Sequence, residues 1–179
     1  MILDDLIINV GELFKKKKIP VALIGAMAVN AYNISRFTKD VDFMILISDF
    51  EGILPDLMEM GLEIFHKQEN FVRLRHREFR EIITDFLFVD EGTLQHILRD
   101  GKSIQMFKQT FVVPSLNHLI AMKLHAIKQN PEREIKDLLD IANLIKEHNV
   151  SVLSESFRAL CLKYGPDTTY DKLLNIFKT

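Results

Sequence analysis

The segment from Pro20 to Ile45, PVALIGAMAVNAYNISRFTKDVDFMI, decides how this chain folds. It opens with a short apolar run at residues 21–24, which is long enough for a buried strand. Gly25 permits a sharp turn after that run, and the small, helix-tolerant side chains at residues 26–32 predict a short helix. Apolar and polar side chains then alternate over residues 40–45, which is the period of a strand. The segment therefore predicts a strand, a glycine turn, a short helix and a further strand.

Asp40 and Asp42 share one face of that second strand, because side chains two positions apart on a strand point the same way. Their positions are roughly 7 Å apart along the strand, and two like charges buried at that spacing repel one another. A divalent cation would resolve the repulsion, and carboxylate oxygens suit Mg²⁺, which takes further ligands from substrate phosphates. Free backbone N–H groups at the turn from Gly25 to Met27 would bind those phosphates. The pattern therefore predicts a magnesium and phosphate site.

A third carboxylate, Asp85, stands in the most apolar predicted strand, residues 82–89 with the sequence IITDFLFV. A carboxylate without a partner would be costly there, so Asp85 needs a cation or a hydrogen-bond donor nearby. One interpretation is a structural aspartate held by hydrogen bonds. We favour the other, in which Asp85 joins Asp40 and Asp42 in a metal-binding triad and accepts the proton of an attacking hydroxyl.

Arg73 and Arg75 share a face with Phe71 in a strand predicted over residues 71–76. Two interpretations of this pair stay open. The guanidinium groups could bind a triphosphate or the backbone of an acceptor RNA. Alternatively, they could form the solvated face of an edge strand that is protected against aggregation.

Two helices are predicted in the C-terminal third, one after Pro114 and one after Pro131. In the first, Lys123 falls inside the apolar stripe, where lysine is rarely buried without a partner. It is either a snorkelling stem at the edge of the stripe or an ammonium that reaches nucleotide phosphates. In the second helix, the apolar residues are expected to face the core and the charged ones to form a solvated face. The predicted core positions are Ile135, Leu138, Leu139, Ala142 and Ile145, and the predicted solvated ones are Arg133, Lys136, Asp137 and Asp140.

Three motifs in the chain match a known pattern. They are Gly25-Ala26-Met27-Ala28, Arg36-x-Thr38-Lys39-Asp40-x-Asp42, and Lys123-x-His125-Ala126 with Lys136-Asp137-x-x-Asp140-Ile141. Together they resemble the nucleotidyltransferase superfamily, and more narrowly its AbiEii-type branch, known chiefly from toxins of toxin–antitoxin systems. The resemblance spans roughly residues 21–145. It implies that two aspartates hold metal ions, that a third strand carboxylate completes the site, and that a nucleoside monophosphate passes from an NTP to an acceptor hydroxyl with loss of pyrophosphate.

The same resemblance implies a set of nucleotide-binding residues around the glycine turn and in the later motifs. They are Gly25, Ala26, Arg36, Thr38, Lys39, Lys123 and Lys136. Ala26 departs from the superfamily, which usually carries Ser or Gly at this position. Its methyl group leaves the turn open, but it supplies no hydroxyl to hold a terminal phosphate. For Lys123, the family pattern favours the ammonium that reaches the phosphates.

Composition limits the function classes. The 179 residues are enough for one well-buried domain, and a formal net charge of −2 argues against general electrostatic binding of nucleic acid, DNA included. Cys161 is the single cysteine, which excludes an internal disulfide and fits a reducing compartment. The longest apolar run, residues 19–29, falls well short of the ~20 residues that span a bilayer. We expect a cytoplasmic protein with no membrane association.

These observations predict an α/β (α+β) protein with the nucleotidyltransferase fold. Residues 1–112 should form a mixed sheet flanked by helices, and residues 113–179 a helical portion packed on that core as one compact unit. The expected function is Mg²⁺-dependent transfer from an NTP to an acceptor on RNA or protein, with one or two metal ions and an antitoxin protein as a partner. Two alternatives stay open: a catalytically silent module that binds a nucleotide or a protein, for which Ala26 is the sign, and an enzyme that modifies a small molecule such as an antibiotic.

Overall fold

The computed structural model describes residues 3–178 and divides the chain into two compact units. The first, the sheet unit, comprises the chain up to Ala31 together with Arg36–Ser115. The second, the helical unit, comprises Tyr32–Ser35 together with the chain from Leu116 onward. The predicted mixed α/β architecture is confirmed. That the helical portion packs on the core stays a prediction.

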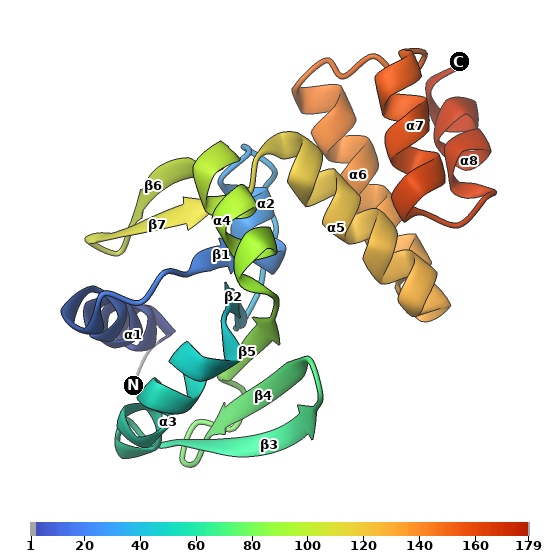
Figure 1. The fold of residues 1–179 in the computed structure, drawn as a ribbon. Coiled ribbons are helices and arrows are strands. Elements are labelled where there is room, and N and C mark those ends of the chain that lie inside the picture. Colours follow the sequence, from blue (N-terminus) through green and yellow to red (C-terminus); the bar gives the residue numbers. More distant parts are fainter. Residues whose placement is uncertain (1–2, 179) are drawn as a thin grey trace. The chain divides into compact units, whose positions relative to one another are not determined.

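Over its described residues, from Leu3 onward, the sheet unit contains seven strands and four helices (Figure 1). The strands are β1 (Ala22–Ile24), β2 (Asp40–Ile45), β3 (Leu62–Gln68), β4 (Phe71–His76), β5 (Ile83–Phe88), β6 (Lys102–Met106) and β7 (Gln109–Val113). The helices are α1 (Leu3–Lys17), α2 (Gly25–Asn30), α3 (Ile47–Glu59) and α4 (Glu91–Asp100). The strand order is β3-β4-β5-β2-β1-β7-β6. The sheet is mixed, because β2 runs parallel to β5 and β1 to β7 while the other neighbouring pairs are antiparallel.

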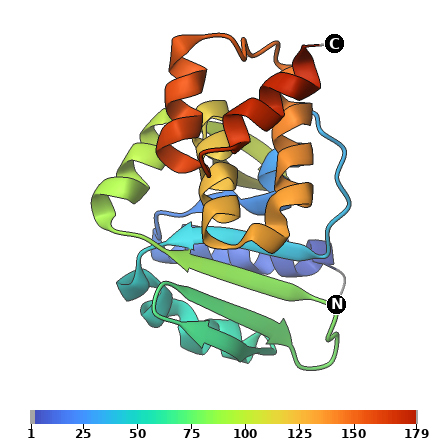
Figure 2. The same ribbon diagram turned by 90° about the vertical axis from the view of Figure 1, so that its right-hand side faces the viewer.

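A cluster of buried phenylalanines lies on one face of the sheet. Phe43 of β2 is fully buried, and Phe14 of α1 meets its ring edge-on at 5.0 Å between centroids. Phe50 of α3 packs on Phe86 and Phe88 of β5 with tilted rings, at 5.0 and 5.1 Å between centroids. Helices α1 and α3 therefore cover the face that bears these phenylalanines, and Figure 2 shows β2, β5, β4 and β3 next to one another. The residues that alternate with the phenylalanines on β2 and β5 point to the opposite face.

The helical unit is formed by successive helices: α5 (Leu116–Gln129), a 3₁₀ turn (Pro131–Arg133), α6 (Glu134–Glu147), α7 (Glu155–Tyr164) and α8 (Thr169–Phe177). Ser154 caps α7 by accepting a hydrogen bond from the backbone N–H of Phe157. The connecting segment that follows α2 joins this unit through Tyr32, whose carbonyl oxygen lies 3.0 Å from Nε2 of His148. Between residues 3 and 178, helices with the length and apolarity needed to cross a membrane are absent.

One prediction about local structure is wrong. In α6 the exposed apolar residues are Ile135, at 87%, and Leu139, at 61%, whereas Asp137 and Asp140 are buried. The predicted assignment of the helix faces was therefore inverted at these positions, because a buried lysine on α5 places the two carboxylates inside (see below). In the sheet unit, β3 extends to Gln68 through polar residues. It is an edge strand whose outer residues are exposed, so it needs no apolar alternation there.

Candidate active site

Three carboxylates gather on the face of the sheet opposite the phenylalanine core. Asp42 of β2 and Asp85 of β5 are direct partners in the parallel pairing of these strands. Asp40 lies two residues before Asp42, hence on the same face, and pairs with Ile83. Asp85 is buried, with 6% exposed, and the other two are half-buried. The structure therefore brings together the three aspartates that the sequence singled out.

Gly25 closes one side of this cluster. It follows β1, whose last residue, Ile24, pairs with Asp42. A Cβ atom placed on Gly25 would lie 1.9 Å from Oδ2 of Asp42, far inside van der Waals contact. Gly25 also has a φ of +67°, which disfavours any residue with a side chain. Glycine is therefore required here for two separate reasons, and the Asp42 carboxylate lies directly against the backbone of the turn.

Arg73 of β4 binds Asp85 through both ends of its guanidinium. Its Nε donates to Oδ1 at 2.8 Å and its Nη2 to Oδ2 at 2.7 Å. These hydrogen bonds raise the pKa of the Arg73 guanidinium, and the negative charges of Asp85, Asp40 and Asp42 act in the same direction. Arg73 also lies over the ring of Phe71, 5.7 Å from its centroid. The buried carboxylate of Asp85 thus has a cationic partner, as the cost of burying an unpaired charge in an apolar strand led us to expect.

Arg75 makes a separate ion pair on the same face. Its Nη2 donates to Glu63 of β3 at 2.9 Å, and its guanidinium lies 4.4 Å from the ring centroid of Phe65. The edge-strand interpretation of this arginine pair is wrong, because β4 lies between β3 and β5 inside the sheet. Binding of phosphate by either arginine stays a prediction.

The loop before β2 is fixed by side-chain hydrogen bonds to its backbone. The Asn30 side chain accepts from the backbone N–H of Arg36 at 2.8 Å and donates to its carbonyl oxygen at 2.9 Å. The hydroxyl of Thr38 accepts from the backbone N–H of Asp40 at 3.1 Å. Lys39, which lies between Thr38 and Asp40 in the sequence, is exposed. These contacts anchor both ends of the motif that leads into the aspartate pair, and the role of its side chains in nucleotide binding stays a prediction.

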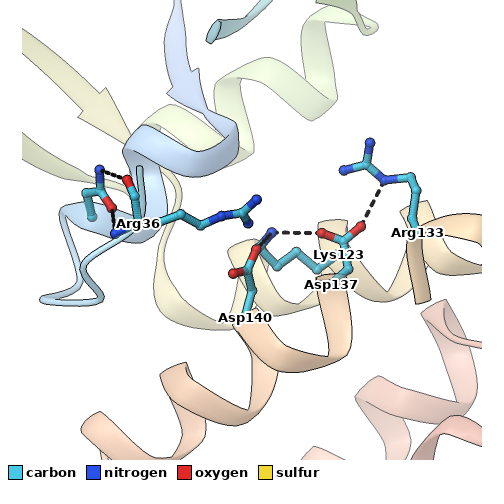
Figure 3. Close-up of polar contacts among 6 residues, drawn as sticks. Arg36, Lys123, Arg133, Asp137 and Asp140 are labelled. Atoms are coloured by element: carbon cyan, nitrogen blue, oxygen red, sulfur yellow. Dashed lines mark hydrogen bonds and ion pairs between the residues drawn. The ribbon is translucent and has the colours of Figure 1, made fainter. Parts of the chain in front are cut away.

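The helical unit holds a second charged cluster, shown in Figure 3. Nζ of Lys123 on α5 donates to Asp137 at 3.0 Å and to Asp140 at 2.6 Å, and Nε of Arg133 donates to Asp137 at 2.8 Å. Lys123 is only 7% exposed, so the snorkelling interpretation is wrong. Lys136 is exposed. Sequence reasoning missed the partners of Lys123, although a lysine in an apolar stripe and two aspartates three positions apart on the next helix were a usable signal.

The three aspartates of the sheet unit offer only carboxylate oxygens, which are hard ligands. Such a donor set fits Mg²⁺ or Mn²⁺ and not a metal that prefers nitrogen or sulfur. Asp42 and Asp85 stand opposite one another on adjacent strands, which lie about 4.8 Å apart, whereas ligand atoms of all three aspartates do not come within 4.8 Å of one another. The chemistry of these residues therefore fits a divalent metal ion, which the paired Asp42 and Asp85 would hold.

The fold is that of a nucleotidyltransferase. Its similar solved structures include the antibiotic-resistance factor ANT(2'')-Ia, with 13% identity, 98% of this chain and 96% of that chain covered, and a TM-score of 0.63. A second is the lincosamide antibiotic adenylyltransferase LnuA, with 16% identity, 74% and 90% covered, and a TM-score of 0.55. A third is an antigenic nucleotidyltransferase-like protein from Paracoccidioides brasiliensis, with 14% identity, 99% and 97% covered, and a TM-score of 0.57.

A match to a family model places the chain more specifically than the similarity of fold does. Residues 13–178 match the family model described as nucleotidyl transferase AbiEii toxin, type IV TA system. The chain therefore belongs to the AbiEii nucleotidyltransferase family, as its motifs predicted. A search of curated proteins found no match.

Proposed function

We propose that this protein transfers a nucleoside monophosphate from an NTP to an acceptor hydroxyl, with release of pyrophosphate. The observation that carries the proposal is the direct pairing of Asp42 with Asp85 across β2 and β5, with Asp40 on the same face. In this proposal the three carboxylates hold one or two Mg²⁺. When bound, the metal would neutralise charge on the phosphates of the NTP and on the attacking oxygen.

Asp85 is the residue proposed to take the acceptor proton. As the acceptor oxygen forms a bond to the α-phosphorus, its proton passes to a carboxylate oxygen of Asp85, and the bond from the α-phosphorus to pyrophosphate breaks. Each oxygen of a carboxylate has about two acceptor positions. The two hydrogen bonds from Arg73 use one position on each oxygen, so Asp85 keeps capacity for the proton.

The nucleotide is proposed to lie along the turn after β1. Gly25 and Ala26 offer backbone N–H groups there, and the loop fixed by Asn30 and Thr38 carries Arg36 and Lys39. Most of the work assigned to these residues is positioning, which supplies much of the rate in phosphoryl transfer. Lys123 and Lys136 remain proposed phosphate contacts on the strength of the family motif alone.

The acceptor is proposed to be an RNA or a protein, and the partner an antitoxin protein. The support for both is the description of the family, which names a toxin of a type IV TA system. Small-molecule acceptors stay in the experiment below as a separate arm.

The test is label transfer from each α-labelled NTP in the presence of Mg²⁺, with total RNA, cell protein and a panel of small hydroxyl compounds as separate acceptor fractions. We expect label to enter one fraction, to need Mg²⁺, and to be lost in Asp42→Asn. Asp49→Asn is the matched control, because Asp49 lies on α3, which covers the opposite face of the sheet, and it should transfer label normally.

The proposed enzymatic activity would be contradicted if the wild type transferred label into no fraction while both variants still bound nucleotide. That result would identify a catalytically silent module.

A further inference from the structure

We propose that Arg73 is the resident counter-cation of the three-aspartate cluster, so that it neutralises Asp85 in the metal-free protein and weakens the binding of a divalent metal ion to the same carboxylate. Arg73 is a positioning residue in this proposal, because it acts through Asp85 and not on the substrate. The inference rests on the proposed function in one respect only, which is that the cluster binds a metal. The claim that Arg73 neutralises Asp85 in the metal-free protein depends only on the contact between these two residues.

The first argument is the shape of the contact. Two parallel N–H···O hydrogen bonds, at 2.8 and 2.7 Å, fix both the position and the plane of the Asp85 carboxylate. Only the planar fork of arginine makes such a contact, since a lysine ammonium is a point charge. Asp85 is buried, so water competes little for its carboxylate and the orientation that Arg73 imposes is kept.

The second argument is charge. Asp42 pairs directly with Asp85, and Asp40 lies on the same face, so three negative charges lie on one partly desolvated patch of the sheet. Like charges on such a patch repel strongly unless a cation lies among them. Arg73 supplies one positive charge inside hydrogen-bonding distance of the most buried member.

The third argument is that Arg73 leaves room. The Arg73 side chain is 40% exposed, whereas that of Asp85 is 9% exposed, so solvent reaches the Arg73 side of the ion pair. Arg73 uses one acceptor position on each oxygen of Asp85, and a carboxylate offers about four in all. A metal ion can therefore coordinate Asp85 while Arg73 stays bound. The two cations then repel one another, and Arg73 weakens metal binding by its charge.

Arg75 provides a matched control on the same strand and face. It is also half-buried, also paired with a carboxylate, Glu63 at 2.9 Å, and also stacked on a phenylalanine. Its partner is not one of the three aspartates. Loss of Arg75 therefore removes a comparable ion pair and leaves the cluster intact.

The experiment measures thermal unfolding of the wild type, Arg73→Gln and Arg75→Gln in EDTA and across a Mn²⁺ titration, together with Mn²⁺ affinity by calorimetry. In EDTA, Arg73→Gln should lower Tm more than Arg75→Gln does. Mn²⁺ should raise the Tm of Arg73→Gln more than that of the wild type. The variant is expected to bind Mn²⁺ more tightly, and the stabilisation by a ligand grows with its affinity for the folded protein. The Kd for Mn²⁺ should fall about tenfold in Arg73→Gln, since one nearby unit charge is lost, and should not change in Arg75→Gln.

Two further variants separate charge from geometry. Arg73→Lys keeps the charge and loses the fork, so its Mn²⁺ affinity should be close to that of the wild type. The double variant with Arg73→Gln and Asp85→Asn removes the ion pair as a unit, and it should recover most of the Tm lost in EDTA. It also keeps the test decisive if Arg73→Gln alone does not fold.

Mn²⁺ affinity that is equal or weaker in Arg73→Gln, or a loss of Tm that neither Mn²⁺ nor the second substitution recovers, would overturn the proposal. A wild type that binds no Mn²⁺ would instead overturn the proposed function. The EDTA comparison of Arg73→Gln, Arg75→Gln and the double variant would then still decide whether Arg73 neutralises the cluster.

Discussion

Asp42 and Asp85 are register partners in the parallel pairing of β2 with β5. The next residues along the two strands, Phe43 and Phe86, pair with one another on the other face. The same register therefore sets the aspartates on one side and two fully buried phenylalanines on the other. A slip of one residue would place Asp85 in the core and Phe86 beside Asp42. The hydrophobic core thus fixes which strand positions bring the carboxylates together, and Arg73 orients the carboxylate of Asp85 there.

Gly25→Ala should abolish activity. The new Cβ atom would overlap Oδ2 of Asp42, and alanine disfavours the φ of +67° at this position. We expect label transfer to fall about 100-fold or more, because displacement of a reacting group by about 1 Å can cost that much. Gly52→Ala is the control. A Cβ atom on Gly52 meets nothing within 4 Å, and alanine in a helix should stabilise the protein by about 0.5–1 kcal/mol.

Lys123→Met should destabilise the protein severely. The substitution leaves Asp137 and Asp140 buried without the ammonium that bonds both. Breaking a buried pair by removing one partner costs about 3–5 kcal/mol, which urea unfolding would measure. Lys136→Met, on the exposed side of α6, should stay within about 0.5 kcal/mol of the wild type. Equal stability of the two variants would show that the Lys123 cluster does not hold α5 and α6 together.

Ala26→Ser should strengthen nucleotide binding. Serine, one of the two residues usual at this place in the superfamily, supplies a hydroxyl, and one new hydrogen bond is worth about 0.5–1.5 kcal/mol. The Kd for the preferred NTP should therefore fall about twofold to tenfold in equilibrium binding. An Ala26→Ser protein with unchanged affinity would mean that the nucleotide does not approach this turn.

The thiol of Cys161 should report unfolding and not activity. Burial raises the pKa of the Cys161 thiol to about 11, so little thiolate forms at pH 8 in the folded protein. Alkylation at that pH should be slow in buffer and fast in urea, where the pKa returns to about 8.5 and the thiol is accessible. Because Cys161 is the single cysteine, Cys161→Ser should take up no label at all. Rapid alkylation of the native protein would contradict its burial in α7.

The sequence was most informative where one face of an element is apolar. Alternation alone placed Asp40 and Asp42 on one face of β2 and Asp85 in the middle of β5, and the structure agrees. It could not show that Asp42 lies opposite Asp85 or that Arg73 binds Asp85. Those relationships depend on which strands become neighbours and in what register, and the residues concerned are far apart in the chain.

Pattern reasoning failed where buried charge replaces apolar burial. On α6 the exposed Ile135 and the buried Asp137 invert the usual rule, because Lys123 of α5 makes burial of the carboxylates favourable. A lysine inside an apolar stripe could have signalled this, since it requires acidic partners on the helix that packs against it. Single-helix periodicity does not contain that information.

The central claim is that Asp42 and Asp85 bind the same divalent cation. The most direct measurement is anomalous scattering from crystals of the protein grown with Mn²⁺ and a non-hydrolysable NTP. The account predicts a manganese peak about 2.2 Å from carboxylate oxygens of both Asp42 and Asp85, and no such peak in Asp42→Asn. A manganese peak bound by other residues, or none on this face of the sheet with the NTP clearly bound, would contradict it.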